Sequence, residues 1–288
     1  MADRKRVALV CPDDSHTEYV INRGLKEGIA DFLLVTGGKR ATFVDELAKE
    51  YPGHVEIAEA ENPDAAAAMA VLAVREGKAD VLMKGTINTD NLLRAVLNKE
   101  HGLLEKGNVM THVTVTHIPS YNKLLLFSDA AVIPKPTMEQ FDAILRYEVE
   151  VCRRLNIEHP KIALIHCTEK VNEKFPHTLC YEKLKENARN GIYGNVDVDG
   201  PMDVKTACDA DSGAIKGISS PVVGNADALI FPNIESGNVF YKTITLFAGA
   251  ETAGMLYGTT APIVVASRAD SGESKFNSLA LACLSHKG

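Results

Sequence analysis

Several features that mark other protein classes are missing from this sequence of 288 residues. It contains no Trp, and no apolar run approaches the length of a membrane span. Its six cysteines include no C-x-x-C pair, which is typical of reduced thiols rather than a disulfide framework. The formal net charge of −7 argues against a nucleic-acid binder, because such a protein needs a basic face for phosphates. What remains is an ordinary globular chain with no nucleic-acid or membrane partner.

Familiar functional motifs are also missing. There is no G-x-G-x-x-G, no G-x-x-x-x-G-K-[ST] and no G-x-S-x-G, which argues against a common dinucleotide site, a P-loop and a serine hydrolase. The first charged residues lead directly into the short apolar run Val7–Val10, so no signal peptide is indicated and we expect a cytoplasmic protein. His166, Cys167, His177 and Cys180 are too irregularly spaced for a typical zinc site, and we expect no metal.

The remaining pattern alternates short β-rich runs with amphipathic segments, which is typical of an α/β fold. We expect two lobes, the first formed by residues 1–134 plus 262–288 and the second by residues 135–261. The expected strands of the first lobe are Val7–Val10, Phe32–Val35, Val55–Ile57, Ala79–Met83 and Pro262–Ala266. Its expected helices are Thr17–Lys26, Ala41–Tyr51, Pro63–Gly77, Thr89–Lys99 and Ser274–Leu284.

The alternation of expected strands and helices changes near residue 113. Two β-like runs, Val113–Ile118 and Leu124–Phe127, predict a hairpin, and a third, Ala130–Ile133, follows them. The second lobe is expected to contain strands Lys161–Ile165 and Ala226–Phe231. Its expected helices are Thr137–Leu155, Tyr181–Ala188, a piece near Lys205–Lys216 and a long helix from Ser236 to about Leu256.

The loop from Lys84 to Asp90 joins an expected strand to an expected helix. In open α/β sheets ligands gather beyond the carboxyl ends of strands, and a helix N-terminus favours an anion. Arg94, near the first turn of the expected helix, could add a bidentate phosphate contact. Such a loop can equally serve only as a polar helix cap.

Two further loops follow expected strands. Ser267, Arg268 and Asp270 lie within four residues after the run Pro262–Ala266 and could bind an oxyanion, although Ser271 or Ser274 could simply start the last helix. The loop from Phe231 to Asn238 is better explained as a capping loop, although it could also face a ligand.

These residues, taken in order, resemble the phosphate acetyltransferase/phosphate butyryltransferase family over nearly the whole chain, and most closely its butyryl branch. The matching segments are Lys84–Thr86, Asn91–Leu97, Phe127–Val132, Asp199–Pro201, Pro221–Ala226, Leu229–Pro232, Ser236–Lys242, Ala248–Glu251 and Ser267–Arg268. An ordered series of this length is far more specific than any single motif.

The resemblance implies a two-domain fold like that of the isocitrate and isopropylmalate dehydrogenases, with the active site in the interdomain cleft. It implies the reversible reaction of an acyl-CoA with phosphate to give an acyl phosphate and CoA, without a cofactor, in a homodimer or higher homo-oligomer. Arg94 and Arg268 would hold the phosphate, and Ser267 would assist the charge at the thioester. We assign substrate binding to seven residues from three segments of the chain: Lys84, Gly85, Thr86, Asn88, Ser128, Asp129 and Asn238.

The chain departs from the acetyl branch at one position. That branch has an aspartate, proposed as the catalytic base, seven residues after the serine, where this chain has Ser274. Asp270 or Glu273 could take over that role. The alternatives to a butyryl-CoA-dependent enzyme are an acetyl-CoA-dependent one, a metal- and NAD-dependent hydroxyacid dehydrogenase of the same fold, and a non-catalytic CoA-binding protein.

Overall fold

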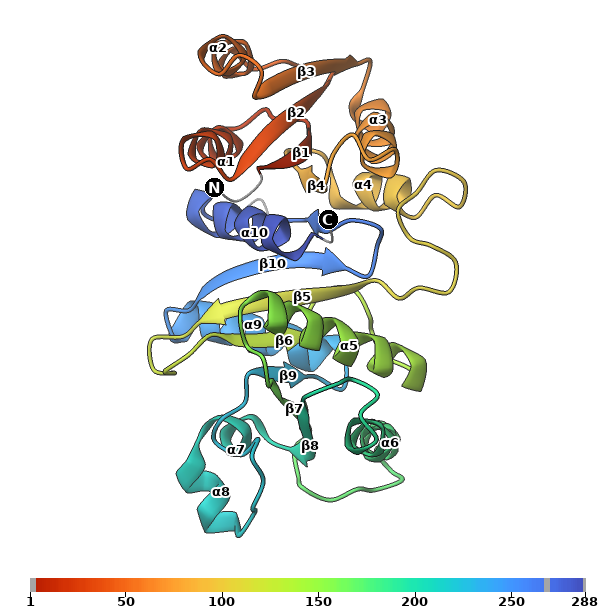
Figure 1. The fold of residues 1–288 in the computed structure, drawn as a ribbon, viewed down its shortest axis with the longest axis vertical. Helices are drawn as coiled ribbons and strands as arrows, with labels where there is room; N and C mark the ends of the chain where they lie inside the picture. Colours follow the sequence, from red (N-terminus) through yellow and green to blue (C-terminus); the bar gives the residue numbers. More distant parts are fainter. Residues whose placement is uncertain (1–3, 267–269, 287–288) are drawn as a thin grey trace. The chain divides into compact units, whose positions relative to one another are not determined.

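The computed structural model describes residues 4–266 and 270–286, and the chain forms two compact units (Figure 1). Unit 1 comprises Met1–Met110 and Ala253–Gly288, and unit 2 comprises Thr111–Thr252. The sequence analysis drew these boundaries at residues 134 and 262 instead. They lie earlier because the chain from residue 111 to residue 128 forms a hairpin that pairs with a strand of unit 2. Among the described residues, no helix has the length and apolar character that crossing a bilayer requires.

Unit 1 contains a sheet with helices on both faces. Its strands are β1 (Lys5–Val10), β2 (Ala30–Gly37), β3 (Val55–Ala60), β4 (Val81–Lys84), β10 (Glu251–Tyr257), which crosses the unit boundary, and β11 (Ile263–Val264). Its helices are α1 (Ser15–Lys26), α2 (Thr42–Glu50), α3 (Pro63–Arg75), α4 (Thr89–Val96) and α10 (Gly272–Ser285).

The sheet of unit 1 runs β3-β2-β1-β4-β11-β10. All pairs are parallel except β10 with β11. Helices α1 and α10 lie on one face, and α3 and α4 lie on the other (Figure 1). Burial on both faces explains why β1 and β4 read as continuous apolar runs. Because β1, β4 and β11 are parallel neighbours, the loops that follow them start at the same edge of this sheet.

Unit 2 is also an α/β layer structure. Its strands are β5 (Thr111–His117), β6 (Leu125–Ser128), β7 (Lys161–Ile165), β8 (Asp197–Met202) and β9 (Ala228–Ile230). Its helices are α5 (Met138–Arg154), α6 (His177–Arg189), α7 (Val204–Cys208), α8 (Ala210–Lys216) and α9 (Ile234–Phe247). The strand order is β5-β6-β9-β7-β8, with β5 antiparallel to β6 and the other pairs parallel.

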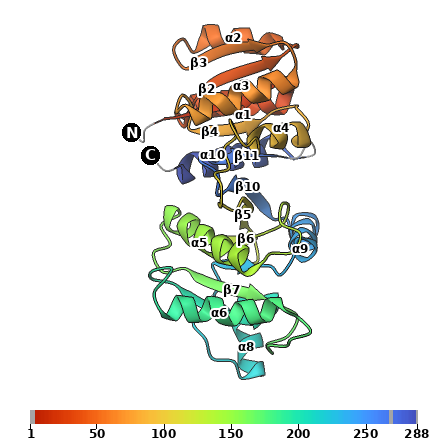
Figure 2. The ribbon, with the colours of Figure 1, turned by 90° about the vertical axis from the view of Figure 1, so that its right-hand side faces the viewer.

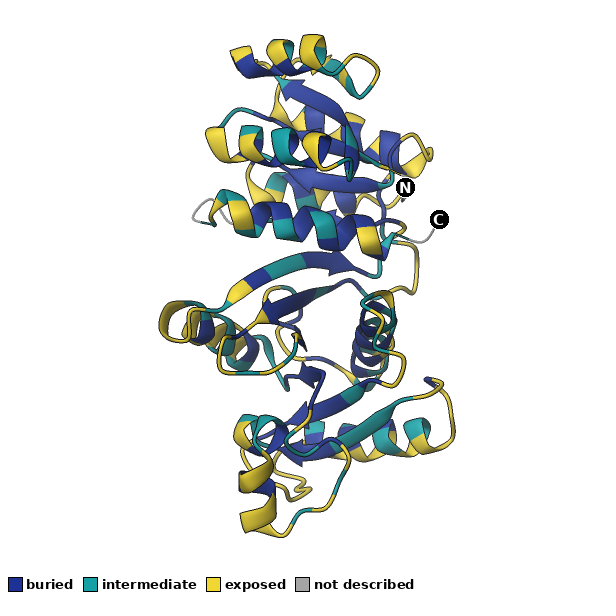
Figure 3. Ribbon diagram, turned by 60° about the vertical axis from the view of Figure 1, so that its left-hand side comes forward, coloured by how far each residue is buried: buried dark blue, intermediate teal, exposed yellow. Residues whose placement is uncertain are grey.

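Aromatic side chains fill both faces of the unit 2 sheet. Phe127 of β6 packs edge-on against Phe240 of α9, with ring centroids 5.2 Å apart. Phe141 of α5 meets Tyr181 of α6 at 5.5 Å. Helices α5 and α9 therefore lie on opposite sides of β6 (Figure 2), and the strands of each unit are largely buried between helices (Figure 3).

The structure corrects two expected elements. The helix expected from Ser236 to Leu256 ends at Phe247, because Gly249 adopts a left-handed φ of 60° and the chain continues as β10. The run Ala130–Ile133 forms bends rather than a strand, because its backbone N–H groups at residues 131 and 132 bond to the Asp129 carboxylate. The expected hairpin and the expected parallel strand at residue 263 are confirmed.

Candidate functional site

Three loops start at the carboxyl edge of the unit 1 sheet, after β1, β4 and β11. Val10 of β1 lies opposite Lys84 of β4, and Val264 of β11 lies opposite Met83. The register therefore brings the residues that follow each strand to one place. Ser267 and Arg268, which the sequence analysis assigned to catalysis, lie outside the described residues.

The loops after β1 and β4 are in direct contact. The Gly85 N–H donates to Val10 O at 2.8 Å, and the Thr86 N–H donates to Cys11 O at 2.9 Å. A Cβ at Gly85 would lie 2.2 Å from Cys11 O, so only glycine allows this approach. The Thr86 hydroxyl also donates to Asp13 Oδ2 at 2.9 Å. Gly85 and Thr86 thus hold two loops of the candidate site together.

Two lysines are buried near this edge. Lys84 is 6% exposed and its Nζ donates to Gly85 O at 3.1 Å, while Lys275, in the first turn of α10, is 7% exposed. Burial raises the pKa of Asp14, but hydrogen bonds from Thr17 and the charge of Lys275 outweigh this effect, so the Asp14 pKa is lowered. Buried ammonium groups at the end of parallel strands favour binding of an anion.

Arg94 is exposed and lies in the last turn of α4, not near its first turn as the sequence analysis placed it. Helix α4 ends at Val96, three residues before the expected Lys99. No carboxylate of the described residues forms a salt bridge with the Arg94 guanidinium. Asn88 occupies the N-cap position of α4, but its side chain makes no capping bond to the helix.

The two candidate bases, Asp270 and Glu273, lie on either side of the residue that caps α10. Ser271 caps the helix by accepting from the Ser274 N–H at 3.1 Å, so the capping role considered for Ser271 is confirmed. Asp270 is half-buried just before this cap. Glu273 instead accepts from Arg23 and, at 2.8 Å, from the Tyr19 hydroxyl, and these contacts hold its pKa below the usual range. Glu273 is therefore a poor proton acceptor at neutral pH.

In unit 2, Ser128 is the last residue of β6 and Asp129 follows it, and both are buried. The Asp129 carboxylate accepts four bonds, from the Thr111 hydroxyl at 2.7 Å and from the N–H groups of residues 112, 131 and 132 at 3.1, 2.7 and 2.8 Å. Asn238 Nδ2 donates to Ala130 O at 3.0 Å. These side chains brace the loop after β6, and their assignment to substrate binding stays a prediction.

The Ser128 hydroxyl donates to Glu148, a residue that the sequence analysis did not single out. Glu148 is fully buried on α5, and burial raises its pKa to about 8 despite the Ser128 hydrogen bond. Its Oε2 has no hydrogen-bond partner among the described residues. Helical spacing could have revealed this position, because Glu148 follows Leu145 and precedes Cys152 on one buried stripe.

Asp13 and Lys275 were also missed at the unit 1 edge. Asp13 Oδ1 is buried without a hydrogen-bond partner among the described residues. The rule that directed attention to the loops after β4 and β11 applies equally to the loop after the first strand, so the sequence contained a signal for Asp13. Nothing in the sequence separates Lys275 from an ordinary surface lysine in a helix.

Two histidines of unit 2, His166 and His177, form a pair. His166 Nδ1 lies 3.1 Å from His177 Nε2, and burial with the charge of His166 lowers the pKa of His177 to about 4. Cys167 Sγ is 3.7 Å from His166 Nε2. Within residues 4–266 and 270–286, no three His, Cys, Asp or Glu side chains are grouped as metal ligands would be.

Comparison with known families identifies the family of the chain. Residues 36–283 match the family described as Phosphate acetyl/butaryl transferase. The chain belongs to this family. Within it, a phosphate butyryltransferase of Clostridium acetobutylicum is 38% identical over 98% of this chain and 93% of its own. A phosphate acetyltransferase of Thermotoga maritima is 35% identical over 97% of this chain and 95% of its own.

A solved structure carries the same fold. The branched-chain phosphotransacylase of Enterococcus faecalis V583 superposes with a TM-score of 0.85 and is 30% identical over 98% of this chain and 100% of its own. The resemblance stated from the sequence motifs is thereby confirmed, and so is the α/β class of the fold.

Proposed function

We propose that this member of the acetyl/butyryl transferase family is an enzyme that exchanges a short acyl group, with four carbons preferred, between coenzyme A and inorganic phosphate. The observation that carries the proposal is the carboxyl edge of the unit 1 sheet, where the loops after β1 and β4 are bonded to each other and where Lys84 and Lys275 are buried. The names of the relatives support the same reaction class.

In the proposed reaction an oxygen of phosphate attacks the carbonyl carbon of the acyl-CoA thioester. The carbon–sulfur bond breaks, and the sulfur leaves as thiolate and takes up a proton. In reverse, the CoA thiolate attacks the acyl phosphate and phosphate leaves. A thiol of pKa about 8.5 needs only modest assistance to ionise near neutral pH.

The residues have separate roles in this scheme. Arg94 and Arg268 bind the phosphate and stabilise the negative charge of the leaving group, and electrostatic stabilisation of this kind usually contributes most to catalysis. Ser267 supports charge on the thioester oxygen. Asp270 is the base that we propose for the CoA thiol, because the only other candidate, Glu273, is paired with Arg23. Holding both substrates together supplies the remaining rate enhancement.

The acyl chain is the finer part of the proposal. Three relatives, at 36–38% identity, are named for butyryl transfer, one of them as probable, whereas relatives at 35% identity are named for acetyl transfer. One solved structure is named for branched-chain substrates, which supports an acyl group longer than acetyl. Family membership gives no support to a hydroxyacid dehydrogenase. The cleft between two lobes, the dehydrogenase-like arrangement, the absence of a cofactor and the cytoplasmic location stay predictions.

A thiol-release assay tests the reaction and the chain length together. Acyl-CoA substrates from C2 to C6, including isobutyryl-CoA, are incubated with phosphate, and free CoA is measured. We expect release that requires phosphate, accepts arsenate in its place and is fastest at four carbons. A maximum with acetyl-CoA would favour the acetyl alternative. If no substrate from C2 to C6 releases CoA, the proposed function is wrong.

The predicted homo-oligomer has a candidate surface on α9. Leu246 and Phe247 are 74% and 81% exposed, and Val239 is 64% exposed further along the helix. A twofold dimer uses the same patch on both copies, so we propose that a second copy of the chain covers this face. Light scattering of a Leu246→Glu/Phe247→Glu variant should then give a smaller assembly than the parent. An unchanged mass would reject α9 as the interface.

A further inference from the structure

Unit 1 has a hollow that none of the proposed catalytic groups lines. It has a volume of about 830 Å³ and lies where β4 and β11 begin, next to Asp80 and Ala261. The loops of the candidate site follow the opposite, carboxyl ends of the same strands. Four residues of β4, roughly 13 Å of extended chain, separate the two regions. We refer to this hollow as the amino-edge pocket.

Hydrogen bonds connect the segments that form the amino-edge pocket. Arg75, the last residue of α3, donates from Nη1 to Gly102 O at 2.7 Å. The Thr260 N–H, in the loop before β11, donates to Leu103 O at 2.9 Å. A Cβ at Gly102 would lie 2.3 Å from Asn98 O, so the chain turns there in a way that only glycine permits. The wall is thus a bonded structure rather than a loose surface loop.

Three cations and two carboxylates, Asp80 and Glu105, are among the described residues that line the pocket. Arg75, Lys99 and Lys106 line it, and none of them forms a salt bridge with a carboxylate of the described residues. Asp80, an acidic neighbour, already accepts from the Arg6 N–H at 2.7 Å. The three cations outnumber the two carboxylates of the described wall, which leaves a local excess of positive charge in a chain of net charge −7.

The composition of the wall narrows the class of ligand. The volume lies within the usual range of small-molecule sites. The apolar members of the wall are aliphatic, such as Val74 and Leu104. The one ring among the described lining residues is the imidazole of His286, which lies 3.8 Å from Asp80, so the wall offers a nucleobase no large aromatic face to stack on. The guanidinium of Arg75 keeps donors beyond its bond to Gly102 O, and such donors match phosphate and carboxylate oxygens.

We propose that the amino-edge pocket binds a compact, aliphatic organic polyanion, a metabolite with two or more phosphate or carboxylate groups, at a site distinct from the catalytic one. Arg75 provides a fixed fork of donors, and Lys99 and Lys106 provide mobile charges at the rim. The ligand need not be a substrate, since the pocket lies at the amino ends of strands whose carboxyl ends lead to the candidate site.

Isothermal titration calorimetry of the full chain tests this site with two probes, fructose 1,6-bisphosphate and citrate. We expect at least one probe to bind, with affinity that weakens as NaCl is raised. A Lys99→Gln/Lys106→Gln variant should lose about tenfold or more in affinity for that probe. Both lysines are exposed, so this variant should fold normally. Arg75→Gln, checked for folding by thermal denaturation, should show a loss of similar size.

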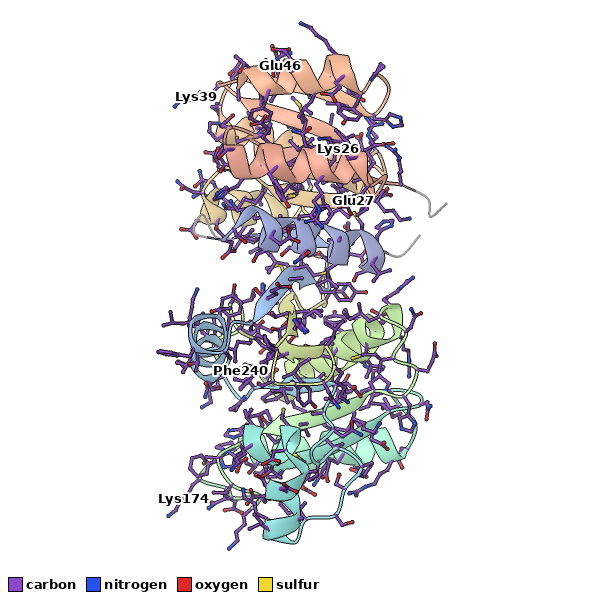
Figure 4. The ribbon with its side chains drawn as sticks, turned by 90° about the vertical axis from the view of Figure 1, so that its left-hand side faces the viewer. Lys26, Glu27, Lys39, Glu46, Lys174 and Phe240 are labelled. Carbon is purple, nitrogen blue, oxygen red and sulfur yellow. The ribbon has the colours of Figure 1, made fainter. Side chains whose placement is uncertain are left out.

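Two controls separate this site from other anion sites. Lys26→Gln/Lys49→Gln removes two exposed lysines outside the pocket, one of them at the end of α1 (Figure 4), and should leave affinity unchanged. Arg94→Gln should also leave it unchanged. Absence of heat with both probes overturns the proposal, as does equal binding by the Lys99/Lys106 variant and the parent, or loss of binding in Arg94→Gln. Because turnover is not measured, failure of the proposed enzymatic reaction would leave this result interpretable.

Discussion

In unit 1, β4 ends at Lys84 and the loop after it begins with Gly85 and Thr86; in unit 2, β6 ends at Ser128 and the loop after it begins with Asp129. Both follow a buried strand and carry polar groups at a carboxyl edge. The loop after β6 uses its polar atoms internally, since Asp129 alone accepts four hydrogen bonds. The loop after β4 is held by backbone hydrogen bonds and by a close approach that only glycine allows. Arg94, in the helix that follows, is exposed and has no salt-bridge partner among the described residues.

The difference suggests a criterion for assigning function to such loops. A polar residue whose donors and acceptors are already satisfied by its own chain stabilises the fold, whereas one that is held in place with capacity left over can bind a ligand. By this criterion we predict that the catalytic groups lie at the unit 1 edge and that the polar groups after β6 stabilise unit 2. Substitutions in the two loops should then separate into effects on activity and effects on stability.

The largest expected effect is that of Arg94→Gln. Loss of a charged donor to the phosphate should lower kcat/KM about 100-fold in the thiol-release assay. The free energy of unfolding should change by no more than about 0.5 kcal/mol, because the side chain is exposed. Lys26→Gln is the matched surface control. A decrease in kcat/KM below about threefold would remove Arg94 from the site and weaken the comparison of the two loops.

Asp129→Asn should show the opposite behaviour. The substitution replaces one acceptor oxygen by an amide donor amid four N–H and O–H donors, so we expect a loss of about 3 kcal/mol in the free energy of unfolding. Urea denaturation measures this, with the exposed Asp211→Asn as control. If stability were unchanged while the KM for a substrate rose, Asp129 would be a ligand-binding residue, as first assigned from the motif.

The buried Glu148 carboxyl should make the free energy of unfolding depend on pH. Its pKa is about 8 in the fold against a usual 4.5, so the folded protein retains a proton that the unfolded chain has lost. The free energy of unfolding should therefore decrease as pH rises from about 4.5 to about 8, by up to about 1.4 kcal/mol per pH unit. In Glu148→Gln this decrease should be absent. Parallel pH profiles of parent and variant would show that the Glu148 carboxyl does not titrate in this way.

Strand periodicity predicted the fold well because burial on both faces leaves apolar runs that a sequence displays directly. Where it failed, a single local interaction decided the structure: Gly249 ended α9 early, and the Asp129 carboxylate took the N–H groups that a strand at Ala130–Ile133 would have needed. Neither a left-handed glycine nor a side-chain acceptor is visible in a hydrophobic pattern.

The candidate site was predictable only to the level of its loops. The carboxyl-edge rule identified the loops after β4 and β11, because it needs only strand order and direction. It could not say that Glu273 pairs with Arg23, a residue 250 positions away in the chain. Nor could it reveal that Lys275 is buried beside Asp14, since both facts depend on the packing of α1 against α10.

The pair Glu273 and Asp270 gives the smallest expected effect and the finest test of the unit 1 edge. Glu273→Gln breaks a bond to Arg23 between partly exposed side chains, so the free energy of unfolding should decrease by less than about 1 kcal/mol. Its turnover should stay within about twofold of the parent, because a carboxylate with a lowered pKa contributes little as a base. Asp270→Asn should instead lower kcat in the thiol-release assay. If Glu273→Gln were slower than Asp270→Asn, Glu273 would be the base, and the assignment of Asp270 to that role would be wrong.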